Sequence, residues 1–557
     1  MDRKLIGPAL NDVAAKYKGD KDAAATLAAK LKEGKGHPQV AATDAELKAI
    51  VGRVLSAPAA ATAAAPKLAN PENAACLGCH GNEGFGMPGA DGKMRPLHVR
   101  VEEFEKSVHA PRRCVDCHSD ITEVPHQKKN ASRDDAKLVI VKNCGGCHAE
   151  NLKSYKDTYH GQVTTLGYAY TATCFDCHGT HGVLRVKDPA STVHPDNRLQ
   201  TCQKCHAGAT QGFVTFQPHA NNHDFERYPH TWIASRMMIG LLAGTFAFFW
   251  LHGAFWFYRE YRDRKQGTPR PHVMAAQALQ AEGKYRGKYY QRFSPMWRVA
   301  HLVFALSLMV LTLTGMTFLY AGSSWAPVVV KALGGPQSAA LIHRVCAVIF
   351  AAVFFAHLAW MAVHVARNWK TFKIFGPNSL MPRWQDLWDM IAMFKWFVGK
   401  GPRPKFDRWT YWEKFDYWAP FWGVTIIGVS GFMMWFPALT ASFLPGWTFN
   451  VAMIAHGEEA FLAAVFLFTV HFFNNHFRPD KFPIDIVMFT GAVPLHEFRR
   501  EHTLEYSRLV QSGELARFMV DAPSAPMTLG SKVLGFTLIA AGLGLLALVL
   551  TGFLGTL

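Results

Sequence analysis

The chain has 557 residues, 49% of them hydrophobic, and a formal net charge of +17 at pH 7. This length leaves room for two or more domains. A strongly basic chain would suit an anionic partner such as nucleic acid. Here, however, most Lys and Arg residues of the carboxyl-terminal part lie in loops beside long apolar segments, where they set the orientation of membrane spans. The composition therefore favours a membrane protein and gives no sign of nucleic-acid binding.

Residues 1–56 contain the segments GPALNDVAAKYKGDKDAAATLAAKLKEGKGHP and DAELKAIVGRVLS. They resemble the part of a small class I cytochrome c that follows its haem-attachment motif, so we expect a small helical fragment. That family carries a Cys-x-x-Cys-His just before the Gly-Pro and a Met ligand after its second helix, and both are missing here. The resemblance implies that Met1 is an internal methionine of a longer natural chain with a signal peptide and a sixth haem motif upstream. His37 is then the substitute ligand.

A haemless domain is the other interpretation of residues 1–56. Mass spectrometry of the native amino terminus separates the two interpretations. An intact chain that starts at Met1 would contradict the interpretation with a longer natural chain. Residues 57–70, SAPAAATAAAPKLA, are predicted to form an Ala/Pro linker.

Five copies of Cys-x-x-Cys-His follow within residues 71–231, which predicts a loop-rich domain with five c haems. Two thiols on adjacent turns add to the two vinyl groups of one haem, and the next imidazole reaches the iron as proximal ligand. Successive copies begin 38, 30, 30 and 28 residues apart. The attachment residues are Cys76, Cys79, Cys114, Cys117, Cys144, Cys147, Cys174, Cys177, Cys202 and Cys205, and the proximal ligands are His80, His118, His148, His178 and His206.

Zinc is the alternative for paired cysteines. A zinc site takes two Cys-x-x-Cys pairs, or one pair and two distant His, and five pairs each followed at once by His do not divide that way. Of eleven cysteines only Cys346 is left over, inside an apolar segment, so no disulfide framework is predicted. Because c haems are attached outside the bacterial inner membrane, we expect residues 71–231 in the periplasm.

The same region holds 14 histidines, which leaves nine for the second axial position on five irons. Six lie in segments that resemble distal-ligand segments of multihaem cytochromes, one more than five haems need: His109, His126, His160, His181, His194 and His219. His98, His223 and His230 are expected at the surface or beside a ligand, with His230 as the first substitute. If every iron has two protein ligands, no position is open for a substrate, and the domain only carries electrons.

Residues 232–557 are predicted to form a six-helix transmembrane domain, which makes the whole chain all-α. Each span needs about 20 apolar residues, and six segments qualify: 232–258, 296–320, 339–366, 417–437, 450–475 and 530–556. The loops after the first and third spans are rich in Lys and Arg, whereas loops 321–338 and 438–449 contain only Lys331. The positive-inside rule therefore places the basic loops in the cytoplasm and the haem c domain in the periplasm.

Histidines inside these spans are candidate ligands of b haems, since ionisable side chains in a membrane span are functional candidates by default. His456 and His471 are 15 residues apart, about 22 Å along a helix and about 60° around it. This spacing suits two stacked haems, with His343 paired to His456 and His301 paired to His471. His357 is the rival of His301. His252, His364 and His476 are expected to have packing or interfacial roles.

The segments RVAHLVFALSLMVLTLTGM, LIHRVCAVIF and MIAHGEEAFLAAVFLFTVHFFNNH resemble the di-haem cytochrome b subunits of formate dehydrogenase and hydrogenase. The resemblance implies haem b ligation by His301, His343, His456 and His471. This sequence has an extra span at each side of the shared core and a spacing of 15 rather than 14 residues, which puts His471 in question. The order of parts is similar to inner-membrane multihaem quinol oxidoreductases, which implies a bound quinone. Polar candidates near haem ends are Arg298, His364, Glu458, Glu459 and Asp485.

We expect a multi-pass protein of the bacterial inner membrane, in a respiratory chain, that passes electrons from a quinol through two b haems to five c haems, or six with an upstream motif. Its partners would be the quinone pool, the lipid bilayer and a periplasmic acceptor such as a soluble or outer-membrane cytochrome. Three other functions fit the same pattern. They are a quinone reductase fed by a periplasmic dehydrogenase, a multihaem terminal reductase, and a membrane anchor subunit of a larger complex.

Overall fold

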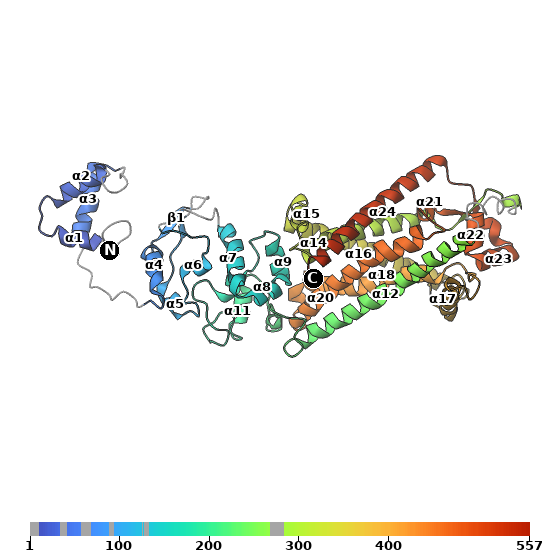
Figure 1. Cartoon of the computed structure of the whole chain (residues 1–557), viewed down its shortest axis with the longest axis horizontal. Coiled ribbons are helices and arrows are strands. Elements are labelled where there is room, and N and C mark those ends of the chain that lie inside the picture. The colour runs from blue at the N-terminus through green and yellow to red at the C-terminus, as the bar shows by residue number, and fades with distance from the viewer. Residues whose placement is uncertain are drawn as a thin grey trace. The chain divides into compact units, whose positions relative to one another are not determined.

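A computed structural model describes residues 10–33, 42–56, 68–88, 94–124, 126, 133–267 and 283–556. The chain divides into two compact units. The first comprises Met1–Leu152 and Ala172–Cys205, and the second comprises Lys153–Thr171 and His206–Leu557. Most of the regular structure in both units is helical (Figure 1).

Three helices lie near the amino terminus: α1 (Leu10–Lys16), α2 (Ala23–Glu33) and α3 (Asp44–Leu55). α3 begins with a capping box, because the Thr43 hydroxyl accepts from the Glu46 N–H while the Glu46 carboxylate accepts from the Thr43 N–H at 2.9 Å. Ala28, Leu47 and Val51 form a small apolar core. These residues are helical, as expected, and His37 lies outside the described residues.

The region of the Cys-x-x-Cys-His motifs consists of short helices and loops. Its elements are η1 (Pro71–Asn73), α4 (Ala74–His80), the hairpin of β1 (Gly86–Pro88) and β2 (Met94–Pro96), α5 (Val101–Lys106), α6 (Cys114–Cys117), α7 (Arg133–Cys147), α8 (Ala149–Lys156), α9 (Tyr159–Thr165), α10 (Cys174–His178), α11 (Arg198–Gln203) and η2 (Phe213–Thr215). Buried apolar side chains are sparse among the described residues here, as at Leu77, Phe104 and Val141. Such a chain buries too little apolar surface of its own to offset the entropy of ordering it.

Six helices among the described residues are long and apolar enough to cross a membrane: α12 (Pro229–Lys265), α14 (Pro295–Leu319), α16 (Pro336–Arg367), α18 (Tyr411–Trp435), α20 with its continuation (Trp447–Phe477), and α24 (Ala525–Leu554). The prediction of six apolar helices long enough to span a membrane is confirmed. Each helix covers its predicted span to within two residues, and α12 extends past its span because Arg259–Lys265 continue the helix beyond the apolar part.

The helix that begins with α20 (Trp447–Phe466) occupies the centre of this bundle. Val465 and Phe468 pack with Met316 of α14 and Ile539 of α24, and Phe466 packs with Phe249 of α12. Beyond Phe466 the helix continues as two π-helical turns, η4 (Leu467–His471) and η5 (Phe473–Phe477). A π-helical turn holds one more residue than an α-helical turn, and such insertions are frequent at functional sites.

We name the two ends of the bundle by the first helix, as the Pro229 end and the Lys265 end. α15 (Ala326–Ala332) and α19 (Pro437–Thr440) lie in the connections at the Pro229 end. The elements at the Lys265 end are η3 (Gly283–Tyr285), α17 (Trp384–Phe397), α21 (Val487–Thr490), α22 (Leu495–Glu501), α23 (Thr503–Gln511), η6 (Glu514–Phe518) and the sheet β4 (Ala492–Pro494), β3 (Tyr289–Gln291), β5 (Met519–Val520) in that order. Tyr290 pairs with Val493 and with Met519, and its ring is buried against Phe498.

Candidate functional site

The Cys-x-x-Cys-His motifs lie on or beside short helical turns. Cys76, Cys79 and His80 share α4, and Cys174, Cys177 and His178 share α10. On a helix, residues three apart lie on the same face, so each pair of thiols points to one side. None of the eleven cysteines forms a disulfide. The motifs are thus arranged so that one flat molecule can meet both thiols and the following imidazole.

Three proximal histidines of the first unit each have a second imidazole opposite them. The ring centres of His80 and His126 are 6.2 Å apart with an angle of 4° between the planes. The centres of His118 and His181 are 6.3 Å apart, and those of His148 and His109 are 6.2 Å apart. The sequence predicted all three second members as distal ligands, without assigning them to particular haems.

A fourth pair lies in the second unit. The ring centres of His160, on α9, and His206, of the fifth motif, are 6.0 Å apart. α9 is held against the membrane helices, because Tyr159 stacks on Phe318 at the end of α14 and Leu166 joins the apolar cluster of Ala321 and Ala326. His160 is therefore fixed by the bundle itself.

The spacing of these rings fits an iron with two axial imidazoles. A metal-bound imidazole nitrogen lies about 2 Å from the metal, and the ring centre lies about 1 Å behind that nitrogen, so two axial rings are about 6 Å apart. Burial lowers the pKa of His118, His181, His109 and His206 below the usual 6.5, which favours the neutral imidazole that binds metals. The residues present therefore fit c haems.

The remaining histidines of this region make other contacts. His194 Nδ1 lies 3.4 Å from an Asp196 carboxylate oxygen, and His219 Nδ1 lies 3.2 Å from the Ser154 hydroxyl. His223 Nδ1 faces Arg236 at 3.3 Å, and the His230 ring stacks on Trp447 at 3.9 Å. His98 keeps partial exposure.

Two further pairs lie inside the membrane bundle. The ring centres of His343 and His456 are 6.3 Å apart, near the Pro229 end. Those of His301 and His471 are 6.4 Å apart, near the Lys265 end. The same four histidines were predicted from the sequence, in the same pairs. The spacing fits two haems with two axial imidazoles each, one near each end of the bundle.

Small residues and hydrogen bonds hold the pair nearer the Pro229 end. A side chain at Gly431 would place its Cβ 3.0 Å from the His456 ring, and one at Gly315 would approach the His343 ring to 3.2 Å. His343 Nδ1 lies 2.9 Å from the Thr314 hydroxyl, and His456 Nδ1 lies 3.0 Å from the Ile427 carbonyl oxygen. With Nδ1 occupied, the Nε2 atoms are left to face a metal.

The other histidines of the bundle contact side chains instead of a second imidazole. His357, the rival of His301, has its Nε2 2.8 Å from the Tyr417 hydroxyl. His252 Nε2 lies 2.5 Å from the Tyr411 hydroxyl, and the His364 ring stacks on Trp360. His476 lies one turn beyond His471 and packs against Phe472.

The polar candidates for a quinone site are spread over both ends of the bundle. The Arg298 Nε and one Glu459 carboxylate oxygen are buried without a hydrogen-bond partner among the described residues. Asp485 pairs with Lys481 at 2.8 Å, which gives it a structural role. The structure does not bring Arg298, His364, Glu458, Glu459 and Asp485 together into one site.

The segment that follows the fifth motif docks on the start of α20. Gly446 N–H donates to the Gly212 carbonyl oxygen at 2.8 Å, and Asn450 exchanges two hydrogen bonds with the backbone of Gln217, of 2.8 and 3.1 Å. A side chain at Gly446 would place its Cβ 2.3 Å from the Phe213 oxygen, so only glycine allows this approach.

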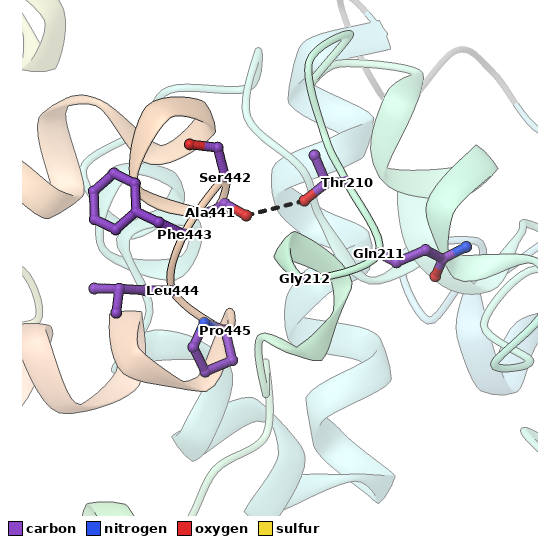
Figure 2. Close-up of a pocket in the computed structure, with 8 residues that line it drawn as sticks. All are labelled: Thr210, Gln211, Gly212, Ala441, Ser442, Phe443, Leu444 and Pro445. Atoms are coloured by element: carbon purple, nitrogen blue, oxygen red, sulfur yellow. Dashed lines mark hydrogen bonds between the residues drawn. The ribbon is translucent and has the colours of Figure 1, made fainter.

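A pocket opens beside these contacts (Figure 2). It is lined by residues 210–212 of the docked segment and by residues 441–445 of the loop before α20. The Thr210 hydroxyl donates to the Ala441 carbonyl oxygen across it at 3.2 Å (Figure 2). The Phe213 ring contacts both His206 and Phe449, with centres 5.1 and 6.0 Å apart. His206 and the segment after it are therefore tied to the helix that carries His456.

Residues 292–477 match the family model described as prokaryotic cytochrome b561. The match covers about a third of the 557 residues and contains all four histidines of the two membrane pairs. No curated protein and no solved structure shows a significant match. The prediction of a cytochrome b-like membrane domain is confirmed for this segment, which supports a haem b cofactor and electron transfer within a lipid bilayer.

Sequence reasoning did not find the side chains that contact the Nδ1 atoms of the membrane histidines. Thr314, Ser430 and Asp416 belong to helices other than those of the histidines they contact. A hydroxyl or carboxylate in an apolar helix gives no sign of which imidazole it meets. Asp416 carries one signal, because an acidic residue within a membrane span is a functional candidate.

Proposed function

We propose that this chain is an electron conduit of the bacterial inner membrane, which takes electrons from a quinol and delivers them to a periplasmic acceptor. The membrane pairs His301–His471 and His343–His456 would hold two b haems. The pairs His80–His126, His118–His181, His148–His109 and His206–His160 would hold four of five c haems. The remaining c haem is the one attached at the fourth motif, through Cys174 and Cys177. Its axial ligands would be His178 and either His194 or His219.

When bound, the haems supply reversible one-electron chemistry, which no protein side chain here provides. The protein would hold the imidazoles in opposed pairs, four of them in the region of the motifs and two between membrane helices. Oxidation of one quinol releases two electrons and two protons, so a proton acceptor beside the quinol completes the reaction.

Docking on α20 of the segment that follows His206 is the observation that carries this proposal. His206 and His160 belong to the same compact unit as the membrane helices, and Phe213 lies between His206 and Phe449. Phe449 is seven residues, about 10 Å of helix rise, before His456. A covalent haem at the fifth motif would therefore lie beside the helix that supports a b haem.

The charges at the Lys265 end support the proposed orientation. The loops at that end carry most of the Lys and Arg of the membrane domain, and such loops stay in the cytoplasm. The Pro229 end would then face the periplasm, the compartment in which c haems are attached. A quinone pool in the bilayer and a soluble or outer-membrane cytochrome are the partners that this arrangement requires.

A haem count tests the proposal. Pyridine haemochrome analysis of the purified protein should give two b haems and at least five c haems per chain, and mass spectrometry should show the added mass of the covalent ones. Fewer than two b haems would contradict the membrane assignment. A five-coordinate, high-spin c haem in the electron paramagnetic resonance spectrum would favour the terminal reductase instead.

A further inference from the structure

The four membrane histidines differ in the group that faces Nδ1. His343 faces a hydroxyl and His456 faces a backbone carbonyl oxygen, both neutral. His471 Nδ1 instead lies 3.3 Å from a carboxylate oxygen of Asp416, on α18. The two proposed b haems therefore differ in one charge beside an axial ligand.

Asp416 is held in place as an acceptor. The side-chain amides of Asn474 and Asn475 point their nitrogens at its carboxylate, at 3.4 and 3.3 Å. Its side chain is 11% exposed. In the part of the chain that the structure describes, no Lys or Arg forms an ion pair with Asp416. A carboxylate that accepts from several N–H groups and has no cationic partner keeps its negative charge uncompensated, and that charge affects the neighbouring imidazole.

The position of the proton on His471 follows from metal binding. If Nε2 binds iron, Nδ1 carries the hydrogen and needs an acceptor. Asn475 Nδ2 also lies 3.2 Å from Nδ1 but is a donor, and it already donates to the His471 carbonyl oxygen at 2.9 Å. The Asp416 carboxylate oxygen, 3.3 Å from Nδ1, is the charged acceptor within reach of that hydrogen.

We propose that Asp416 is a positioning residue that lowers the reduction potential of the b haem held by His301 and His471 below that of the haem held by His343 and His456. A ligating imidazole that donates to a carboxylate becomes a more basic ligand, which stabilises the oxidised iron. Neutral partners at the other pair have no comparable effect. The inference rests on the proposed function.

The order of potentials sets the direction of electron flow. An electron passes from the lower to the higher potential, so the His301–His471 pair would hold the haem that gives up an electron and the His343–His456 pair the haem that accepts it. No bond forms or breaks, and the Nδ1 hydrogen stays on His471. The membrane domain would therefore carry electrons toward the c haems, as a quinol oxidase does, and not away from them.

Potentiometric titration of the b-haem absorbance in the full-length protein tests this inference. In Asp416→Asn, the lower of the two b-haem reduction potentials should rise by at least about 59 mV. This rise corresponds to a tenfold change in the equilibrium constant of a one-electron reduction. The higher potential should stay in place. Asp416→Glu keeps the charge and should restore the wild-type value, and Thr314→Val is the matched control at a neutral partner, which should leave the lower potential unchanged.

Two unchanged b potentials in Asp416→Asn would overturn the inference, and so would a rise in the higher one alone. If Asp416→Asn fails to assemble, His456→Ala gives a second test, because it removes the other b haem. The haem that remains should titrate at the lower wild-type potential, and titration at the higher one would overturn the inference. The haem count of the wild-type protein is made first, so that absent b haems are recognised as failure of the proposed function.

Discussion

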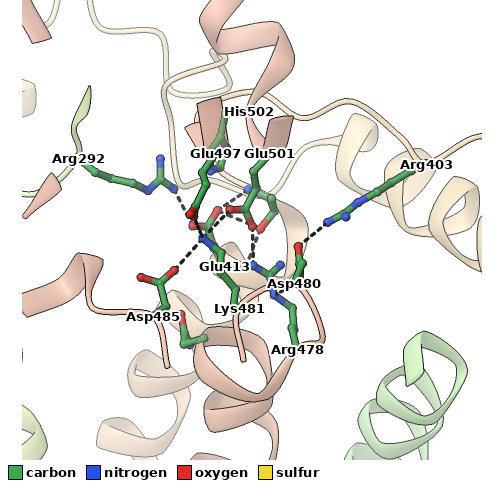
Figure 3. Close-up of polar contacts among 12 residues, drawn as sticks. Arg292, Arg403, Glu413, Arg478, Asp480, Lys481, Asp485, Glu497, Glu501 and His502 are labelled. Atoms are coloured by element: carbon green, nitrogen blue, oxygen red, sulfur yellow. Dashed lines mark hydrogen bonds and ion pairs between the residues drawn. The ribbon is translucent and has the colours of Figure 1, made fainter. Parts of the chain in front are cut away.

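Buried charged side chains gather at the Lys265 end of the bundle, directly after η5 (Figure 3). Arg478 donates to Glu501 at 2.6 Å, and Lys481 lies 2.8 Å from Asp485. Burial alone would raise the pKa of Glu501, but Lys481 and Arg478 hold it well below 4.5. Each charge in this cluster is offset by opposite charges, and loss of one partner in such a setting costs about 3–5 kcal/mol.

His502 at the edge of this cluster predicts a pH dependence. Its Nδ1 donates to the Asp407 carbonyl oxygen at 2.7 Å, and burial, with Arg292, lowers its pKa to about 4 although Glu413 and Glu501 oppose the shift. Between pH 6.5 and 4 the unfolded chain binds a proton that the native protein does not, so stability is present above pH 6.5 and falls as the pH drops. The slope is about 1.4 kcal/mol per pH unit.

The measurement is the free energy of unfolding in detergent between pH 7 and 4, followed by helix circular dichroism. His502→Asn keeps an N–H donor but does not titrate. The slope of the free energy of unfolding against pH should therefore decrease by about 1.4 kcal/mol per pH unit over this range. An unchanged slope would show that His502 does not carry this dependence.

The helix that begins with α20 decides the spacing of the two histidine pairs that we propose as b-haem ligands. His456 and His471 are 15 residues apart, one more than in the cytochrome b subunits that the sequence resembles. η4 accounts for the extra residue, since a π-helical turn holds one residue more than an α-helical turn. The rings of both histidines therefore meet their partners despite the longer spacing.

Deletion of Thr469, inside η4, tests this account. It should convert the π-helical turn to a regular α-helical turn with 14-residue spacing, and both b haems should be retained. Insertion of one Ala after Thr469 should turn His471 by about 100° and remove the b haem at that end. Pyridine haemochrome counts of the two variants provide the measurement. Loss of a b haem in the deletion variant would contradict a register role for η4.

At the scale of the whole molecule, the second compact unit combines His206, the last residue of the fifth motif, with the membrane helices. Backbone contacts at Gly212 and Gln217 tie the segment after His206 to the start of α20. The proposed path from membrane to c haems therefore enters through the fifth motif.

Removal of a membrane ligand should separate the two parts of this path. In His471→Ala, a quinol analogue should reduce the c haems at least about tenfold more slowly, because an incomplete axial pair fails to hold its haem. Dithionite should still reduce them fully. His357→Asn is the control, since His357 contacts Tyr417 and no second imidazole. Stopped-flow spectroscopy of the c-haem absorbance measures the rates, and a wild-type rate in His471→Ala would contradict the path.

The sequence by itself determined the motifs and the six apolar spans, and it predicted the four membrane histidines. Covalent spacing in Cys-x-x-Cys-His and the apolar length of a span are local properties, so they can be read without knowing the fold. The choice of His301 over His357 came from a resemblance, and the structure agrees with it, because the His301 ring faces His471 whereas His357 Nε2 contacts the Tyr417 hydroxyl.

Only the tertiary structure decided which side chains meet. It pairs His109 with His148, 39 residues later, although the motif of His118 is nearer in the chain. His118 pairs with His181 instead. It also places Asp416 beside His471 and inserts η4 into the central helix. These contacts join residues distant in sequence, and their choice depends on packing of the whole bundle, which no local pattern of residues records.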